Sequence, residues 1–228
     1  ANYQYNMPLV INDNAFDIYR NTFKEFGLGV KTGIDLPVES VGTTSDNKTP
    51  GLLLDFVMGQ YDTYTPMQLS QYISTIANGG NRLKPHLLKE VHEESDSSSL
   101  GKVIYTYPVT VLNKVNTSKE NLDRVKEGFH AVTMKSYGLG RKYIDDSHDP
   151  SGKTGTSQSF IDADNDNIID TPTVSTAFIG YAPTVNPKMA IVVTSPDSSI
   201  ENANNSYSSL VTRRITKRVS DAYFSMYN

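Results

Sequence analysis

The chain has 228 residues, of which 37% are hydrophobic and 20% charged, so it can bury a sizeable core and is not expected to be disordered. Its net charge is -4 and its basic residues are scattered, which argues against nucleic acid as a partner. The absence of cysteine excludes disulfides, thiolate metal sites and cysteine nucleophiles, and no apolar run approaches the ~20 residues that cross a bilayer.

The first third of the chain predicts two helices separated by a long connection. Apolar residues at helical spacing predict a helix over residues 15–26, which the glycines that follow would end. Residues 31–50 are rich in Gly, Pro, Thr, Ser and Asp and predict little regular structure. At residues 65–68 the sequence Thr-Pro-Met-Gln predicts a helix start, with threonine as N-cap and glutamine reaching back to it. This helix is predicted to end at residues 78–80 and to bury Leu69, Tyr72, Ile73, Ile76 and Ala77.

The middle of the chain predicts two strands and a further helix. Residues 87–94 and 103–112 have the composition of strands, and Pro108 places the second strand at a sheet edge or breaks it. Thr117 with Glu120 resembles a capping box. The helix that it begins is predicted to end near residues 137–138 and to bury Leu122, Val125, Phe129 and Val132.

The last third predicts three strands and a closing helix. The strands are expected at residues 151–160, 174–182 and 188–195, and the short connection at 183–187 favours an antiparallel meander. Helices before and after an antiparallel sheet give an α+β fold. The closing helix is expected from about Asn205, with its apolar residues at Tyr207, Leu210, Val211, Ile215, Val219, Ala222, Tyr223 and Met226.

The sequence Lys153-Thr154-Gly155-Thr156, followed by Ser157-Gln158, lies in the first strand of that meander. A strand edge can pair with an extended peptide, a lysine can hold a terminal carboxylate, hydroxyls can add hydrogen bonds, and glycine leaves room. This combination suits a peptide that ends in a free carboxylate. Because side chains alternate along a strand, the interpretation requires a site at the strand's edge.

The triplet alone does not decide between this interpretation and an ordinary edge strand with a solvated lysine. A second copy of Lys-Thr-Gly occurs at residues 31–33, inside the long connection. The Lys-Thr-Gly motif therefore does not identify a binding strand without its surrounding sequence.

Five phrases together are more specific, and they are similar to the class B penicillin-binding proteins, in that family's order. The match runs from about Phe23 to Ser195, most of the chain. The phrases are GIDLP at residues 33–37, GQ at 59–60 with TPMQL at 65–69, ANGG at 77–80, SGKTGT at 151–156, and FIGYAP at 178–183 with Asn186-Pro187 following.

The resemblance implies the fold of the serine β-lactamases and transpeptidases, with residues 1–228 as the C-terminal part of a single transpeptidase domain, incomplete in this chain. In that family a serine in an SxxK motif attacks the D-alanyl-D-alanine peptide, an SxN motif assists, and β-lactams acylate the same serine. Both motifs lie before the GIDLP loop, where this chain has no serine. We therefore expect a portion of the same protein outside this chain to carry them.

The resemblance also implies roles, partners and a location. Lys153, Thr154, Gly155, Thr156 and Gln158 would bind the substrate, and the Thr156 amide would form half of an oxyanion hole. The partners would be a peptidoglycan stem peptide, β-lactams and the serine-bearing portion. The protein would act at the extracytoplasmic face of the bacterial cell membrane, anchored by an N-terminal segment outside this chain. Neither a metal nor an organic cofactor is required.

Three other groups of residues could suggest chemistry. SxxK is spelled at residues 45–48 and 99–102, but neither copy opens an apolar helix, so neither is expected to be catalytic. Residues 162–170 resemble a calcium loop, yet asparagine takes the sixth position and Thr173 the twelfth, so a solvated acidic loop is the better interpretation. The four histidines, His86, His92, His130 and His148, lack metal-ligand spacing.

Two alternatives to a transpeptidase stay open. A serine β-lactamase or β-lactam sensor would share the fold and the Lys-Thr-Gly strand, although GIDLP and TPMQL argue against it. A scaffold module without catalysis would need no serine at all. Residues upstream of Ala1 would discriminate, because the enzyme needs SxxK followed by SxN there.

Overall fold

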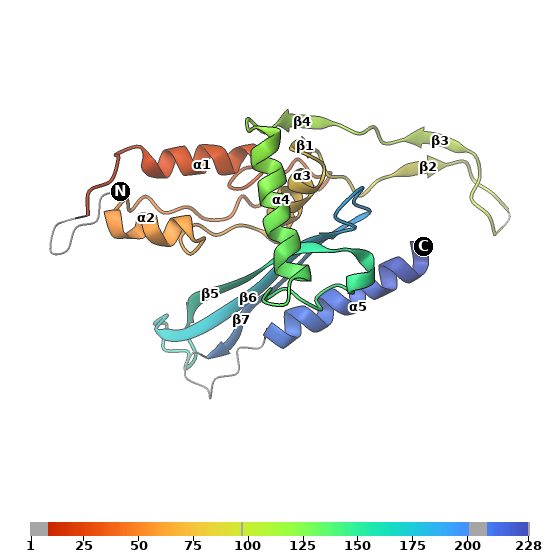
Figure 1. Ribbon diagram of the computed structural model, residues 1–228. Helices are drawn as coiled ribbons and strands as arrows, with labels where there is room; N and C mark the ends of the chain where they lie inside the picture. Colours follow the sequence, from red (N-terminus) through yellow and green to blue (C-terminus); the bar gives the residue numbers. More distant parts are fainter. Residues whose placement is uncertain (1–8, 97, 201–208, 228) are drawn as a thin grey trace.

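The computed structural model describes residues 9–96, 98–200 and 209–227 (Figure 1). The helices are α1 (Ala15–Glu25), α2 (Pro50–Val57), α3 (Pro66–Ala77), α4 (Lys119–Met134), the short 3₁₀ helix η1 (Asp146–His148) and α5 (Ser209–Tyr227). The strands are β1 (Asn81–Leu83), β2 (Glu90–His92), β3 (Val103–Thr106), β4 (Val111–Lys114), β5 (Ser151–Ile161), β6 (Thr171–Ala182) and β7 (Met189–Ile200). The expected start of the last helix near Asn205 lies outside the described residues.

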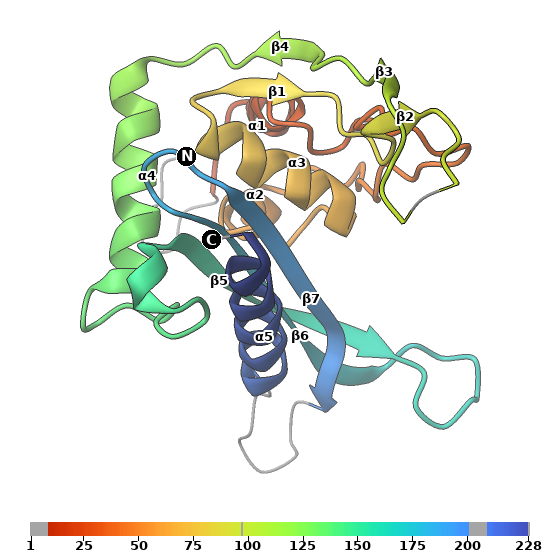
Figure 2. The same ribbon diagram turned by 90° about the vertical axis from the view of Figure 1, so that its right-hand side faces the viewer.

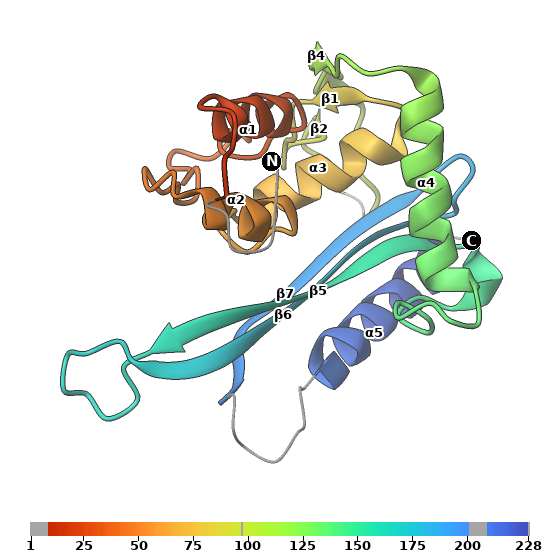
Figure 3. The same cartoon turned by 60° about the vertical axis from the view of Figure 1, so that its left-hand side comes forward.

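A three-stranded antiparallel sheet in the order β5-β6-β7 forms the centre of the fold. Helix α5 packs on one face of this sheet and α3 on the other, while α4 lies across the start of β5 (Figures 2 and 3). On the α5 face Phe178, Ile191 and Phe224 belong to one core cluster, and on the α3 face Ile73, Ala77 and Tyr181 form another. The predicted α+β fold and its meander are confirmed.

Helix α3 begins and ends where the sequence predicts. The Thr65 hydroxyl accepts the Gln68 amide proton, and the Gln68 side chain accepts the Thr65 amide proton, so both bonds of the capping box are present. Gly79 and Gly80 follow the helix with positive φ angles of 84° and 94°, which end it at little steric cost. Of the five residues predicted to be buried, Ile73, Ile76 and Ala77 are in the core, and Leu69 and Tyr72 are half-buried.

Helix α4 forms, but its predicted limits were wrong at both ends. Ser118, and not Thr117, is the N-cap, and its hydroxyl accepts the Asn121 amide proton at 3.1 Å. A serine caps as well as a threonine, so two adjacent candidates could not be separated from the spelling. The helix ends at Met134. Of its predicted core face, Leu122 is buried and Val125 is exposed.

Several short elements were not predicted. Helix α2 has eight residues and begins at Pro50, the last residue of the segment that the sequence predicts to be irregular. Its Leu53 and Phe56 pack with Phe16 of α1 in a core of their own. The predicted strand at residues 103–112 is broken at Pro108 into β3, paired with β2, and β4, paired with β1. The β2-β3 ribbon extends away from the rest of the molecule (Figure 1).

Helix α5 turns a different side to the sheet than its apolar pattern suggests. Thr212, Thr216 and Ser220 are fully buried, and Phe224 is nearly so. The Thr216 and Ser220 hydroxyls donate to the carbonyls of Thr212 and Lys217 in the same helix, so these small polar side chains are buried with their hydrogen bonds made. Several of the predicted apolar residues are exposed instead: Leu210, Val211, Ile215, Val219 and Met226.

Candidate substrate-binding strand

Strand β5 is at the edge of the sheet, and Lys153–Thr156 lie in its first half. In the described part of the chain it pairs only with β6, so its outer edge is open. Lys153 lies opposite Ile179, Thr154 opposite Phe178, and Thr156 opposite Thr176. The edge position that the interpretation requires is therefore present.

Contacts around Gly152 show which backbone groups of β5 face the open edge. A Cβ atom placed on Gly152 would lie 2.7 Å from the Ile179 carbonyl oxygen, so that oxygen points towards β5. Lys153 and Ile179 are consequently a hydrogen-bonded pair, and such pairs alternate with non-bonded pairs along an antiparallel ladder. Thr154 and Thr156 occupy the alternate positions. Their amide and carbonyl groups are directed to the open edge.

The side chain of Lys153 agrees with this orientation. Its Nζ donates to the Thr154 carbonyl oxygen at 2.6 Å, which requires that carbonyl to be accessible and not used by β6. Lys153, Gly155, Thr156 and Gln158 are exposed, and Thr154 is half-buried. A cation, two outward amides and two outward carbonyls thus lie along one short edge. Such an edge can hold an extended chain with a negative end.

One contact at this edge was not predicted. The Gln60 side chain, from the loop after α2, donates from Nε2 to Gln158 Oε1 at 3.4 Å. The two residues are 98 positions apart in the chain. Gln60 belongs to the GQ phrase of the resemblance, but nothing in its spacing indicates that it reaches β5.

The other Lys-Thr-Gly triplet, at residues 31–33, has different surroundings. Glu39 Oε1 accepts the Thr32 amide proton at 2.6 Å and the Thr32 hydroxyl at 2.5 Å, and Glu39 Oε2 accepts the Gly33 amide proton at 3.2 Å. Burial raises the pKa of the Glu39 carboxyl, but these bonds outweigh it and leave that pKa below its ordinary value. Thr32 is fully buried, so this triplet closes a loop and presents no free edge.

Both copies of SxxK lie outside helices, as predicted. Ser45 and Lys48 are in an irregular segment before α2, where the Ser45 hydroxyl accepts the Asn47 amide proton and Lys48 Nζ is 2.9 Å from Asp17 Oδ2. Ser99 and Lys102 lie in the connection between β2 and β3. In neither place does a helical turn hold the serine beside the lysine.

In the acidic loop, three aspartates that alternate along the chain lie close together in space. Asp162, Asp164 and Asp166 bring carboxylate oxygens within 4.8 Å of one another. Asn167, at the sixth position, has a φ of 67°, so asparagine supplies the turn that the calcium loop obtains from glycine, and the prediction was wrong on that point. Thr173, at the twelfth position, is buried and its hydroxyl donates to Asp197 Oδ1 at 2.6 Å. No side chain there supplies the bidentate ligand of that loop.

The four histidines have separate surroundings. His86 stacks on Tyr107 and His148 on Phe224, with ring centroids 4.2 and 3.9 Å apart. His92 Nδ1 lies 2.7 Å from the Gly101 carbonyl oxygen, and His130 Nε2 lies 2.8 Å from Asp149 Oδ1. Within the described residues, the three aspartates of the acidic loop are the only group of His, Cys, Asp or Glu close enough to hold a metal.

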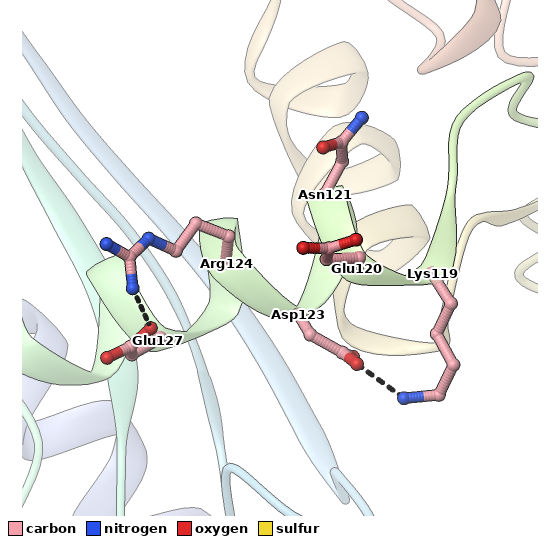
Figure 4. A pocket seen from close by; sticks show the side chains of 6 residues that line it. All are labelled: Lys119, Glu120, Asn121, Asp123, Arg124 and Glu127. Carbon is pink, nitrogen blue, oxygen red and sulfur yellow. Dashed lines mark hydrogen bonds and ion pairs between the residues drawn. The ribbon is translucent and has the colours of Figure 1, made fainter.

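A charged hollow on α4 is separate from the β5 edge (Figure 4). It is lined by Lys119, Glu120, Asn121, Asp123, Arg124 and Glu127. Lys119 pairs with Asp123, and Arg124 with Glu127 at 2.8 Å, all on exposed side chains of one helix. Exposed pairs of this kind contribute little to stability, and nothing in the hollow indicates a ligand.

Comparison with known proteins identifies the family of the chain. The profile of the family described as "Penicillin binding protein transpeptidase domain" matches residues 12–220. The chain belongs to this family. It is 43% identical over 224 residues to penicillin-binding protein 2A of Bacillus subtilis, covering 98% of this chain and 31% of that protein. The resemblance to class B penicillin-binding proteins is therefore confirmed.

Two further matches extend this result. The solved structure of penicillin-binding protein 2B from Streptococcus pneumoniae R6 superposes with a TM-score of 0.80 at 33% identity, covering 99% of this chain and 35% of that one. The peptidoglycan D,D-transpeptidase MrdA of Acinetobacter baumannii is 28% identical over 205 residues, which cover 81% of this chain and 29% of that protein. The chain thus spans about a third of the length of these relatives. Among the described helices none is long and apolar enough to cross a membrane.

Proposed function

We propose that this chain is the substrate-binding part of a peptidoglycan D,D-transpeptidase that cross-links stem peptides through an acyl-serine intermediate. The observation that carries the proposal is the open edge of β5, where the exposed Lys153 lies beside the outward backbone groups of Thr154 and Thr156. The similarity to the peptidoglycan D,D-transpeptidase MrdA supports the same reaction.

Each group at the edge has a role in this proposal. The Lys153 ammonium binds the terminal carboxylate of the peptide or of a β-lactam, with the Thr154 and Thr156 hydroxyls adding hydrogen bonds. Gly155 has no side chain, which lets the peptide approach the strand closely. The Thr156 amide, directed outwards, donates to the oxyanion that forms when serine attacks the carbonyl. Gln158 contacts the peptide further along the edge.

The nucleophile, in this proposal, belongs to a portion of the same protein outside the chain. That portion brings the SxxK and SxN motifs to the β5 edge and supplies the second amide of the oxyanion hole. The exposed apolar residues of α5, from Val211 to Met226, support the presence of further protein packed there, because water is an unfavourable neighbour for such a stripe. The protein is anchored at the extracytoplasmic face of the membrane by an N-terminal segment.

Labelling with penicillin tests the proposal. The complete protein is incubated with labelled penicillin, digested, and the modified peptide identified by mass. We expect the label on a serine outside residues 1–228, and no label when the 228-residue chain is incubated alone. A stable label on Ser45 or Ser99 would contradict the proposal. A label released by hydrolysis within minutes would favour a β-lactamase, and no label on the complete protein would favour a scaffold.

A further inference from the structure

The two residues before β5 form a corner at which several segments meet, and we infer that His130 of α4 is a positioning residue that fixes the β5 edge through this corner. The inference rests on the proposed function for the edge itself. His130 and Asp149 lie outside the five phrases of the resemblance.

The corner is held by hydrogen bonds from two different directions. The Asp149 carbonyl oxygen accepts the Thr184 amide proton at 2.7 Å and the Thr184 hydroxyl at 2.8 Å. The Ser151 hydroxyl is 2.8 Å from the same Thr184 hydroxyl. These bonds join the start of β5 to the connection after β6. From the other side, the Thr133 hydroxyl of α4 donates to the Pro150 carbonyl oxygen at 2.5 Å.

The His130 side chain completes the link between α4 and the corner. Its Nε2 lies 2.8 Å from Asp149 Oδ1, and because an ionised carboxylate only accepts hydrogen bonds, Nε2 is the donor. Asp149 has a φ of 47°, in the left-handed region that few residues occupy without a stabilising contact. His130 therefore holds in place a residue whose backbone conformation turns the chain into β5.

The position of the corner explains why it matters for the edge. Lys153 is four residues after Asp149, or roughly 13 Å along an extended strand. In the described residues β5 has no neighbouring strand on its outer side, so the β6 ladder and this corner restrain its first half, and the Gln60–Gln158 hydrogen bond lies further along the strand. A shift of about 1 Å in a binding group can cost on the order of 100-fold in rate. A restraint at the start of β5 is thus a restraint on the proposed oxyanion and carboxylate contacts.

Three variants of the complete protein test the inference. His130→Ala removes the donor, and His130→Gln keeps a side-chain N–H near the position of Nε2. His86→Ala is the matched control, since His86 stacks on Tyr107 at the base of the β2-β3 ribbon and has no contact with the corner. The measurements are the acylation rate with penicillin, the melting temperature, and hydrogen exchange of the backbone followed by mass spectrometry.

We expect His130→Ala to slow acylation roughly tenfold. It should also raise exchange about tenfold in the peptide that contains Ser151, Lys153 and Gly155, whose amides face β6, while β7 peptides stay unchanged. His130→Gln should recover most of both effects, and His86→Ala should show neither. Unchanged exchange at β5 in His130→Ala, or an equal rise across the whole sheet, would overturn the inference. Exchange is readable even if penicillin does not acylate the protein, so failure of the proposed function is distinguishable from failure of the corner.

Discussion

The sequence Lys-Thr-Gly occurs twice in the chain, and the lysine is exposed in both copies, but the surroundings of the threonine and of the backbone differ. At residues 31–33 the threonine is buried and both it and the glycine donate to the Glu39 carboxylate. At residues 153–155 the lysine is exposed and the strand has an open edge. In the first copy the threonine and glycine bind a carboxylate of the protein itself, whereas in the second the strand edge stays open, with Lys153 Nζ bonded only to the neighbouring Thr154 carbonyl among the bonds described. Function therefore depends on which hydrogen-bonding groups the fold leaves free.

The largest expected difference between the two copies is in acylation. In the complete protein, Lys153→Ala should slow acylation by a carboxylate-bearing β-lactam roughly 100-fold, because a charge-assisted contact to the carboxylate is lost. The melting temperature should change little, since an exposed lysine contributes less than ~0.5 kcal/mol to folding.

Lys31→Ala is the matched control. The Lys31 side chain is exposed, and the bond from Arg82 goes to its backbone carbonyl, which the variant keeps. Acylation should be close to that of the unmodified protein. Equal losses of acylation in the two variants would remove the distinction between the triplets.

A variant next to the first triplet should change stability and leave acylation unchanged, the opposite of the result expected for Lys153→Ala. Glu39→Gln should lower the free energy of unfolding by about 2 kcal/mol, because the buried Thr32 loses its bonds to a charged acceptor. Acylation of the folded protein should not change. Chemical unfolding at neutral pH measures the first quantity, and an unchanged midpoint would show that the Glu39 contacts contribute nothing.

The contribution of the Glu39 carboxylate to stability should depend on pH in a definite direction. The folded-state pKa of Glu39 is below its ordinary value, so the carboxylate contributes stability that is present above the unfolded pKa. That contribution is lost as the pH falls through the lower, folded-state pKa. The difference in free energy of unfolding between the Glu39→Gln variant and the unmodified protein should therefore become smaller in acid. Unfolding curves measured from pH 7 downwards test this.

The glycines of the two triplets offer a smaller and more selective contrast. Gly33 has a φ of 81°, so Gly33→Ala should cost about 1 kcal/mol through backbone strain. A Cβ atom on Gly155 would lie 3.5 Å from the Ala177 Cβ, an ordinary contact, so Gly155→Ala should leave stability almost unchanged. Its methyl group should crowd the peptide and slow acylation about tenfold. A variant at Gly155 that unfolds the protein without affecting acylation of the folded fraction would contradict this assignment.

The elements that the sequence predicted well are those that local chemistry decides. The capping box at Thr65 and Gln68 specifies the start of α3 through two bonds within one turn, and both are present. The strands β5, β6 and β7 have enough β-branched and apolar residues to be recognised without their partners. Pro108 could be recognised as a break for a similar reason, since it has no amide proton for a ladder.

The elements that could not be predicted depend on distant contacts. Helix α2 has eight residues and is stabilised by Phe56 packing on Phe16, 40 positions earlier. In α5 the apolar pattern suggested a buried stripe, yet the sheet takes the side of Thr212, Thr216 and Ser220, and the hydrogen bonds that satisfy them are visible only in three dimensions. At the candidate site, no pattern in the sequence indicates the His130–Asp149 contact, which joins α4 to the corner before β5.

The acidic loop at residues 162–170 is a second motif whose interpretation depends on the hydrogen bonds that its residues make. Its three carboxylates lie together, but Asp162 already accepts the amide protons of Asp166 and Asn167, and Asp166 that of Ile168. These hydrogen bonds stabilise the loop, and the Thr173 hydroxyl at the twelfth position donates to Asp197. We therefore expect a chelator to leave the melting temperature unchanged, and millimolar calcium to raise it by less than about 1 °C. Calorimetry with and without each additive measures this. A clear fall in the melting temperature with the chelator would mean that the carboxylates bind an ion strongly. In that case the sequence motif would have predicted the function of the loop better than its hydrogen bonds do.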